Sequence, residues 1–472
     1  MNPPSDPSPP PPASSPEPSL VDRLGPDRLV LLVALVGFHG LVRIAERYLP
    51  AYVEALGYGP VVVGLLASLG LAVAVGVRFV DGESDETSSG RRRHHLALVA
   101  TLFGALGLLV WAGAPTLDAL LGTPLSAVGW LLVGVVLLGL CHGWGPDETG
   151  SLRGRGVAFG GSVIDLDAAS RTRIRTRTRT IAAALALAGG AVLATTAFSG
   201  AETVRAGFAL LVAAGSTVGL VAAVALGVAR TASRTDDSGS GQTKDGSEAA
   251  PLPSTALPTL EDVRETVDAL PAETRWTVAG DTLVRLATAM TLPFVVLVVV
   301  DYHAVALTVG PVSLPPAAVF GPLVLAEAIG AVAGALAAPM LRPRVDRRWH
   351  LAAGLVVPAV FPLALVAAPS SVAVLAALFA LVGCRTALEP VRPTESVVTQ
   401  TVARVRERGR GRRRSRAAVP ETLRTAIRVA LVPAPLLGGV LYAIGPVAAF
   451  SLATTVGLLG VRELLRPLRD SS

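Results

Sequence analysis

The sequence predicts an all-α membrane protein with twelve transmembrane helices in two six-helix pseudo-repeats. The first observation is composition, because 51% of the 472 residues are hydrophobic and only 16% are charged. Soluble proteins carry about 25% charged residues, so this chain has too few polar side chains to cover soluble domains. The second observation is a series of long apolar segments, and the third is the placement of basic residues between them.

Composition and motifs exclude several other classes of protein. The chain's two cysteines are too few for a disulfide scaffold or a multi-cysteine metal site. Aromatic residues make up 4% of the chain and are not interleaved with the main basic runs, unlike in proteins that stack nucleic-acid bases. Metalloprotease, P-loop, dinucleotide-binding and GxSxG motifs do not occur. We therefore expect no enzyme activity, no cofactor, no metal ion and no nucleic-acid partner.

Twelve segments reach or approach the roughly 20 apolar residues that cross a bilayer core. A polar, Gly/Ser-rich stretch separates the first six from the last six. The twelve predicted spans are residues 28–50, 59–80, 95–114, 125–145, 180–199, 202–229, 272–300, 312–340, 350–368, 370–390, 422–443 and 446–466.

Basic residues occur in alternate connections between these segments. The runs Arg91–Arg93, Arg171–Arg179 and Arg404–Arg416 lie on one side of the predicted membrane, whereas connections 115–124 and 301–311 contain no Lys or Arg. An excess of Lys and Arg marks the cytoplasmic side. We therefore expect a multi-pass protein of the cytoplasmic membrane, with both termini in the cytoplasm and anionic lipid headgroups bound at its cytoplasmic loops.

The spans divide the chain into four regions. Residues 1–27 are rich in Pro and Ser and are expected to form a disordered cytoplasmic tail. Residues 28–229 and 272–467 are the predicted N-terminal and C-terminal six-helix bundles. The cytoplasmic linker between them, residues 230–271, is polar and flexible, and its segment Glu261–Leu270 is expected to form a short amphipathic helix on the membrane surface.

The two halves echo each other at a nearly constant offset. Leu41–Ala45 reads LVRIA in the first span, and Leu283–Ala287 reads LVRLA in the seventh, 242 residues later. The chain's cysteines, Cys141 and Cys384, lie 243 residues apart in the fourth and tenth spans. Parallel repeats of this kind are related by an axis along the membrane normal, and transporters built from them bind substrate between the halves near the midplane.

Several local motifs resemble the major facilitator superfamily. Residues 433–442, PAPLLGGVLY, are similar to the eleventh span of that family. The connection between the second and third spans resembles the family's signature loop, with residues 83–89 as an insertion. Its matching residues are Gly76, Asp81, Gly90, Arg91 and Arg92. The resemblance implies alternating access between two six-helix halves, with these five residues in a gating loop.

One submotif of the same family bears on function. The fifth span contains Gly189-Gly190 but lacks the preceding Gly-Pro that is usual in proton-coupled drug exporters. Its absence weakens the interpretation of the chain as a drug exporter.

Charged residues within the first span are candidates for substrate binding, because a charge at the bilayer centre costs about 2.5–3.5 kcal/mol. His39, Arg43 and Arg47 share one helical face, with Glu46 beside them. Arg43 has a repeat partner, Arg285, and we expect both to face a central cavity where they bind a carboxylate or phosphate, together with His39. The structural alternative is an Arg43–Glu46 ion pair, with Arg47 extending outward to the membrane surface.

Three acidic residues are candidates for proton coupling, since burial favours the neutral form of a carboxyl group. Glu327 stands alone among apolar residues of the eighth span. Asp281 lies one turn before Arg285, so neutralisation of that arginine is its alternative role. Glu46 is the third candidate, in the first span.

These features together predict a secondary active transporter. We expect proton-coupled efflux of a small organic solute by a monomer. One alternative is an exchanger of organic anions or phosphate esters that uses the paired arginines, and another is a transport-inactive membrane sensor or scaffold.

Overall fold

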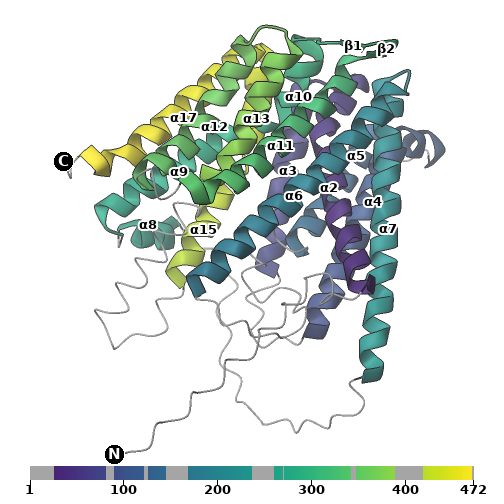
Figure 1. The fold of residues 1–472 in the computed structure, drawn as a ribbon, viewed down its shortest axis with the longest axis horizontal. Helices are drawn as coiled ribbons and strands as arrows, with labels where there is room; N and C mark the ends of the chain where they lie inside the picture. Colours follow the sequence, from purple (N-terminus) through teal and green to yellow (C-terminus); the bar gives the residue numbers. More distant parts are fainter. Residues whose placement is uncertain are drawn as a thin grey trace, which may run out of the picture.

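A computed structural model shows a bundle of long helices that alternate in direction (Figure 1). The described residues are 26–80, 90–121, 126–144, 168–236, 260–268, 270–341, 347–388 and 418–469. Six helices form the N-terminal half of the bundle. They are α2 (Pro26–Ala55), α3 (Pro60–Val80), α4 (Gly90–Leu121), α5 (Ala127–Trp144), α6 (Ala168–Ser199) and α7 (Val204–Asp236).

The C-terminal half follows a short helix, α8 (Leu260–Asp268), and repeats the same up-and-down order. Its first crossing combines α9 (Ala272–Thr291), η2 (Leu292–Phe294), α10 (Val295–Leu297) and the π-helical turn η3 (Val298–Tyr302). Strands β1 (Leu307–Val309) and β2 (Val312–Leu314) then form an antiparallel hairpin. The remaining helices are α11 (Pro316–Leu341), α12 (Arg347–Ala367), α13 (Val372–Leu388), α15 (Ala418–Leu431), α16 (Ala434–Ile444) and α17 (Pro446–Arg469).

Prolines explain where the helices depart from the predicted spans. The seventh crossing tightens into η2 at Pro293, which has no N–H to donate. The predicted eleventh span is two helices, because a turn at Val432 and Pro433 separates α15 from α16. The start predicted for the eighth span is wrong, since residues 312–314 form β2 and α11 begins at Pro316, a favoured first helical position for proline.

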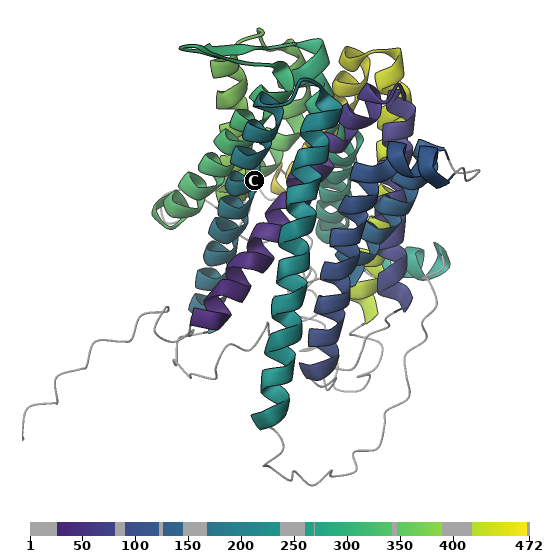
Figure 2. The same ribbon diagram turned by 90° about the vertical axis from the view of Figure 1, so that its right-hand side faces the viewer.

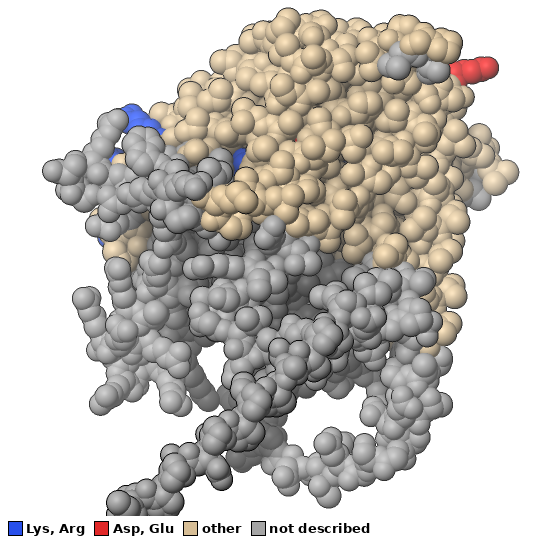
Figure 3. Space-filling model, in the orientation of Figure 1, with Lys and Arg blue, Asp and Glu red and all other residues tan. Residues whose placement is uncertain are grey.

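The helices have the length and surface of a multi-pass membrane protein. Among the described residues, nine helices are long and apolar enough to cross a bilayer, and two shorter apolar helices cover Ala353–Ala367 and Val372–Arg385. Helix α2 is also long, with 30 residues, but carries several charged side chains. Figure 3 shows a broad described face almost free of Lys, Arg, Asp and Glu. Such a face suits contact with lipid chains.

The two halves meet along two helix pairs, α3 with α16 and α6 with α11. Small residues allow the close approach of their backbones. A Cβ added at Gly439 of α16 would lie 2.6 Å from the Pro60 carbonyl oxygen of α3, and one at Gly321 of α11 would lie 2.8 Å from the Ala191 carbonyl oxygen of α6. Glycine is therefore required at both crossings.

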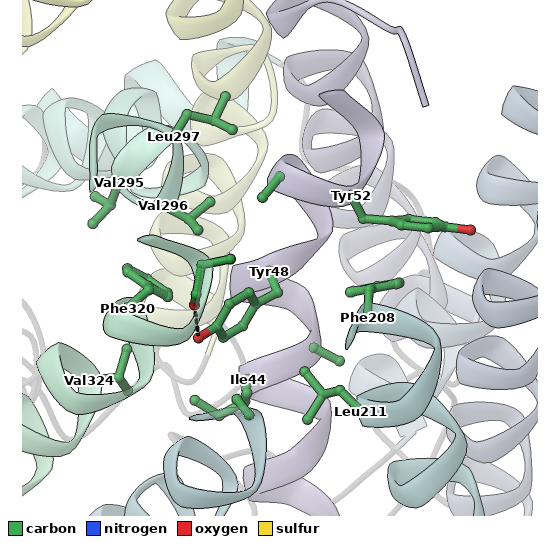
Figure 4. Packing of buried hydrophobic residues seen from close by; sticks show 14 of the residues in the cluster. Ile44, Tyr48, Tyr52, Phe208, Leu211, Val295, Val296, Leu297, Phe320 and Val324 are labelled. Carbon is green, nitrogen blue, oxygen red and sulfur yellow. Dashed lines mark hydrogen bonds between the residues drawn. The ribbon is translucent and has the colours of Figure 1, made fainter. Parts of the chain in front are cut away.

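The end of the bundle that bears β1 and β2 (Figure 2) is here called the hairpin end. It is closed by a hydrophobic cluster shared by both halves, part of which Figure 4 shows. Tyr48 of α2 stacks on Phe198 of α6 at 4.4 Å between ring centroids and meets Phe320 of α11 edge-on at 5.1 Å. Its hydroxyl donates a 2.9 Å hydrogen bond to the Ala317 carbonyl oxygen. The opposite end, where α4 and α6 begin, is here called the base.

Candidate functional site

An ion pair joins the two halves of the bundle below the closed hairpin end. Arg47 of α2 donates two parallel hydrogen bonds to Glu327 of α11, from Nη1 to Oε2 at 2.5 Å and from Nη2 to Oε1 at 3.0 Å. Bidentate pairing of this kind is the strongest geometry between arginine and a carboxylate. With a rise of about 1.5 Å per residue, Glu327 lies roughly 16 Å below the start of α11, near the middle of a 30 Å hydrocarbon core.

A second pair lies beside the first, within the N-terminal half. Nε2 of His142, on α5, is 2.6 Å from Oε1 of Glu46, on α2. The His39 ring approaches the His142 ring edge-on, with 6.2 Å between ring centroids. Four polar residues of α2 thus lie toward one side of the helix, because positions 39, 43 and 47 recur at the helical spacing and 46 adjoins them.

Two more arginines lie within electrostatic range of these carboxylates. Arg43 interacts with both Glu46 and Glu327, and Arg385 of α13 interacts with Glu327. Helix α13 reaches this position because Gly383 packs directly against the Glu327 backbone, where a Cβ would collide. We call His39, Arg43, Glu46, Arg47, His142, Glu327 and Arg385 the central cluster.

The central cluster is not fully buried, because Arg47 and Glu327 keep 23% and 20% exposure. Arg43 is exposed, although it lies roughly 18 Å from the end of α2 by the helical rise. It shares a helical face with Arg47, which contacts the opposite half, so its exposure is on the side between the halves. The hydrophobic cluster around Tyr48 closes the hairpin end above it.

The proton-coupling candidate Asp281 forms a separate pair in the C-terminal half. Arg285 donates a 3.0 Å hydrogen bond from Nε to Oδ2 of Asp281, one helical turn earlier on α9, and its Nη2 lies 2.9 Å from the same oxygen. The Asp281 side chain is 4% exposed and that of Arg285 is 30% exposed. The ion pair considered as the alternative for Asp281 is therefore present, and the substrate-binding role of Arg285 stays a prediction.

The structure corrects one expectation and leaves others as predictions. The expectation that Arg47 extends outward to the membrane surface is wrong, because it binds Glu327 across the halves. The predicted first span ends at residue 50, whereas α2 continues to Ala55, which places Arg47 about 7 Å deeper. The substrate-binding roles of His39 and Arg43, and the proton-coupling roles of Glu46 and Glu327, stay predictions.

The predicted gating loop is described only in part. Gly76 lies in α3 and Gly90 begins α4. Asp81 lies outside the described residues, as do the side chains of Arg91 and Arg92. No group of three or more His, Cys, Asp or Glu residues in the described part of the chain is placed to hold a metal ion.

Sequence reasoning missed three members of the central cluster. The sequence favours extension of Arg47 to the membrane surface, places Arg385 four residues before Glu389 as a local pair, and gives His142 no metal-ligand or helical spacing to other polar residues. The periodicity of residues 39, 43 and 47 was the available signal for Arg47. Contacts between helices distant in sequence determine the other two.

Comparison with known proteins identifies the fold. No protein-family model and no curated protein sequence matches this chain. Among solved structures, it is similar to a peptide transporter POT in complex with sulfate, with TM-score 0.61, 16% identity and coverage of 97% of this chain and 96% of that chain. A POT family transporter in complex with 5-aminolevulinic acid has TM-score 0.56 and 12% identity, covering 94% and 97%.

A structure of nucleoside transporter NupG gives a similar result, with TM-score 0.55, 11% identity and coverage of 92% of this chain and 96% of that chain. The likeness therefore extends over nearly the whole of each molecule. The chain has the fold of major facilitator transporters, as its sequence motifs predicted.

Proposed function

We propose that this protein is a secondary transporter that moves a small organic solute across the cytoplasmic membrane by alternating access. The observation that carries the proposal is the Arg47–Glu327 ion pair, which joins the two halves at mid-depth. The similar transporters of known structure were solved with sulfate and with 5-aminolevulinic acid, and ligands of that size suit a site between two helical halves. The solute would enter from the base and bind at the central cluster.

Opening of the hairpin end requires the halves to separate there. The Tyr48–Ala317 hydrogen bond and the aromatic contacts of Tyr48 would break. Contacts along α3–α16 and α6–α11 would serve as the surfaces on which one half rocks against the other. The base would close in the same movement.

The Arg47–Glu327 pair would couple this movement to a proton. While Arg47 is bound, the Glu327 carboxylate is neutralised by two hydrogen bonds. Separation of the halves removes that guanidinium and its two hydrogen bonds, although Arg385 of the same half stays near Glu327. A buried carboxyl group that loses its hydrogen-bonded cation shifts toward the protonated form. Proton binding to Glu327 would thus stabilise the state in which the pair is broken, and proton release would restore the pair.

The positive-inside pattern supports the orientation of the molecule. Arg91–Arg93 begin α4, and Arg171–Arg179 lie in the first turns of α6, both at the base. The base would therefore face the cytoplasm, together with both termini. Efflux remains our expected direction, and reporter tags within residues 231–256 together with flux measurements in oriented vesicles test both assignments.

A proteoliposome experiment tests the proposed coupling. Vesicles loaded with a pH-sensitive dye are given a panel of small organic solutes, and solute-dependent proton movement is recorded for wild type and Glu327→Gln. We expect movement with at least one solute for wild type and none for the variant. Glu463→Gln, which removes an exposed ion pair with Arg466 on α17, is the matched control and should behave as wild type. Equal proton movement in Glu327→Gln would refute the assignment of Glu327.

A further inference from the structure

An apolar pocket lies at the base of the C-terminal half, between the short helix α8 and the start of α9 (Figure 1). Its volume is about 370 Å³, within the roughly 300–1,000 Å³ range of ligand pockets. Val267 and Leu270 line it on the side of α8, and Val278, Ala279 and Leu283 line it on the side of α9. Its lining contains no member of the central cluster, so the proposed transport does not account for it.

Packing fixes the walls of this pocket. Leu270 and Val278 are buried together with Leu423 and Ile427 of α15. Arg275, which also lines the pocket, donates a 2.9 Å hydrogen bond from Nε to the Leu270 carbonyl oxygen. The chain at the end of α8 is therefore attached to both α9 and α15, and the space beside these contacts is bounded by packed residues.

The pocket begins at the level of the membrane–water interface. The apolar span of α9 starts at Thr274, next to Arg275. Trp276 is 39% exposed, and the guanidinium of Arg466 on α17 lies 4.3 Å from the centre of its ring. Exposed tryptophan at the end of a span is typical of that interface. Leu283 lies eight residues beyond Arg275, roughly 12 Å deeper by the helical rise, so the pocket extends from headgroup level toward the acyl chains.

The polar residues beside the pocket carry both signs of charge. Arg264 and Arg275 are exposed and approach Asp268 at 3.9 and 3.7 Å, and Glu265 is exposed on the same helix as Arg264. Exposed ion pairs at such distances contribute little, so groups of a ligand can replace them. Arginine binds phosphate, and a carboxylate binds an ammonium group. These side chains therefore complement a zwitterionic headgroup better than a purely anionic one, which the two carboxylates would repel.

We propose that this pocket binds a zwitterionic phospholipid. An acyl chain is the apolar group that the bilayer supplies at this depth, and one chain would lie between α8 and α9. The phosphate would contact Arg264 and Arg275, and the headgroup ammonium would contact Glu265 and Asp268. The lipid would thus add to the contacts that keep α8, which follows the linker between the halves, on the C-terminal half. This inference does not depend on the proposed transport function.

Native mass spectrometry of the purified full-length chain tests the site. The protein is titrated in detergent with dioleoyl phosphatidylethanolamine, phosphatidylcholine or phosphatidylglycerol before release into the gas phase. We expect at least one of the two zwitterionic lipids to bind at least fivefold more tightly than phosphatidylglycerol. Equal or tighter binding of phosphatidylglycerol would overturn the headgroup assignment, and binding of none of the three would overturn the site.

Filling the pocket should exclude the acyl chain. Each buried methylene group strengthens binding about fourfold, so Ala279→Phe, which excludes two or more of them, should lower the affinity at least tenfold. Ala279→Leu fills less space and should give an intermediate loss, which keeps the test valid if the larger side chain prevents folding. Leu336→Phe adds the same ring at an exposed position of α11 and should bind lipid as wild type does. Wild-type affinity in both Ala279 variants would overturn the pocket assignment.

Charge substitutions test the headgroup contacts. Arg264→Gln should lower the affinity for all three phospholipids about threefold, because it removes a phosphate contact. Asp268→Asn should abolish the preference over phosphatidylglycerol, because it removes an ammonium contact. Both side chains are exposed, so neither change should disturb folding. Arg205→Gln, at the hairpin end, is the matched control and should bind as wild type does. An unchanged preference in Asp268→Asn would contradict the proposed orientation of the headgroup.

Quenching of Trp276 fluorescence locates the lipid in a bilayer. Bromine atoms on acyl chains quench nearby tryptophan, and the difference between wild type and Trp276→Phe isolates the signal of Trp276. In liposomes that contain equal fractions of either brominated lipid, phosphatidylcholine should quench this signal more than phosphatidylglycerol. Ala279→Phe should make the two lipids equal. Equal quenching by both lipids in wild type would mean that only unselected bilayer lipid contacts this face, and would overturn the site.

Discussion

Replacing Glu327 by glutamine should shift the balance between the two arrangements of the halves. The substitution keeps the size of the side chain but removes the carboxylate that receives two hydrogen bonds from Arg47. Removing one partner of a buried ion pair costs about 3–5 kcal/mol, because the other charge is left uncompensated. Arg47 and Glu327 retain 23% and 20% exposure, so screening by water lowers the expected cost to about 2–3 kcal/mol.

That cost applies only to the arrangement in which the pair is formed. The state with a closed hairpin end should therefore lose population relative to the opposite state by roughly 30- to 150-fold, since each 1.4 kcal/mol corresponds to a factor of ten. A shift of that size makes a scarce state with an open hairpin end detectable. It is smaller than the roughly 10,000-fold change needed to turn a 1:99 ratio of open to closed states into 99:1.

Pulsed electron–electron distance measurements detect the shift. Labels are placed at Glu202→Cys and Ile444→Cys, which are exposed positions at the hairpin ends of the two halves, after replacement of Cys141 and Cys384 by alanine. Glu327→Gln should populate a longer distance that is scarce in the unsubstituted background. An unchanged distance distribution in Glu327→Gln would refute the claim that this pair holds the hairpin end closed.

A double-mutant cycle tests whether Arg47 and Glu327 interact, and Glu463→Gln is its control. Arg47→Gln with Glu327→Gln removes both charges, so its cost should be smaller than the sum of the two single costs. Strict additivity would mean that the two side chains do not interact in solution. Glu463→Gln, whose partner Arg466 lies three residues away on an exposed part of α17, should leave the distances unchanged.

Three further substitutions probe the hairpin end and the interface between the halves. Tyr48→Phe removes the 2.9 Å hydrogen bond to the Ala317 carbonyl oxygen and should weaken closure by about 1 kcal/mol, which a change in the 202–444 distances would show. Gly439→Val would collide with the Pro60 carbonyl, so its melting temperature should fall, with a loss of at least about 2 kcal/mol; wild-type melting would contradict that packing. Arg205→Gln removes the side chain that donates from Nε to the carbonyl at the end of α2 at 2.8 Å. It should lower stability by about 1 kcal/mol in thermal unfolding, and no change would show that water replaces this contact.

The fold could be predicted from the sequence because its main determinants are local. Each apolar segment must be long enough to cross the bilayer, and the basic runs between segments alternate with connections that lack Lys and Arg. Arrangement into two parallel halves followed from echoes such as LVRIA and LVRLA. The points where a membrane-crossing helix is interrupted were harder to predict. Pro50 lies inside the continuous helix α2, whereas Pro293 lies in the 3₁₀ turn that interrupts the seventh crossing, and the sequence does not distinguish the two cases.

The central cluster could be predicted only in part. The energetic cost of charge in a membrane identified Arg43 and Glu327 as candidates from their positions alone. Their partners could not be found in the same way, because Arg47 and Glu327 are separated by 280 residues. Helical periodicity shows which residues share a face, whereas the packing of whole helices decides what that face meets. Arg385 comes within electrostatic range of Glu327 because its helix packs against α11 at Gly383.

Alternating access is the central claim, and the most direct test is to observe it in a membrane. Wild-type protein with fluorescent labels at positions 202 and 444 is placed in liposomes, and energy transfer is followed in single molecules at two pH values. Alternating access predicts two interconverting levels, with the low-transfer level gaining population as protons are added and losing its pH response in Glu327→Gln. A single constant level at both pH values would contradict it.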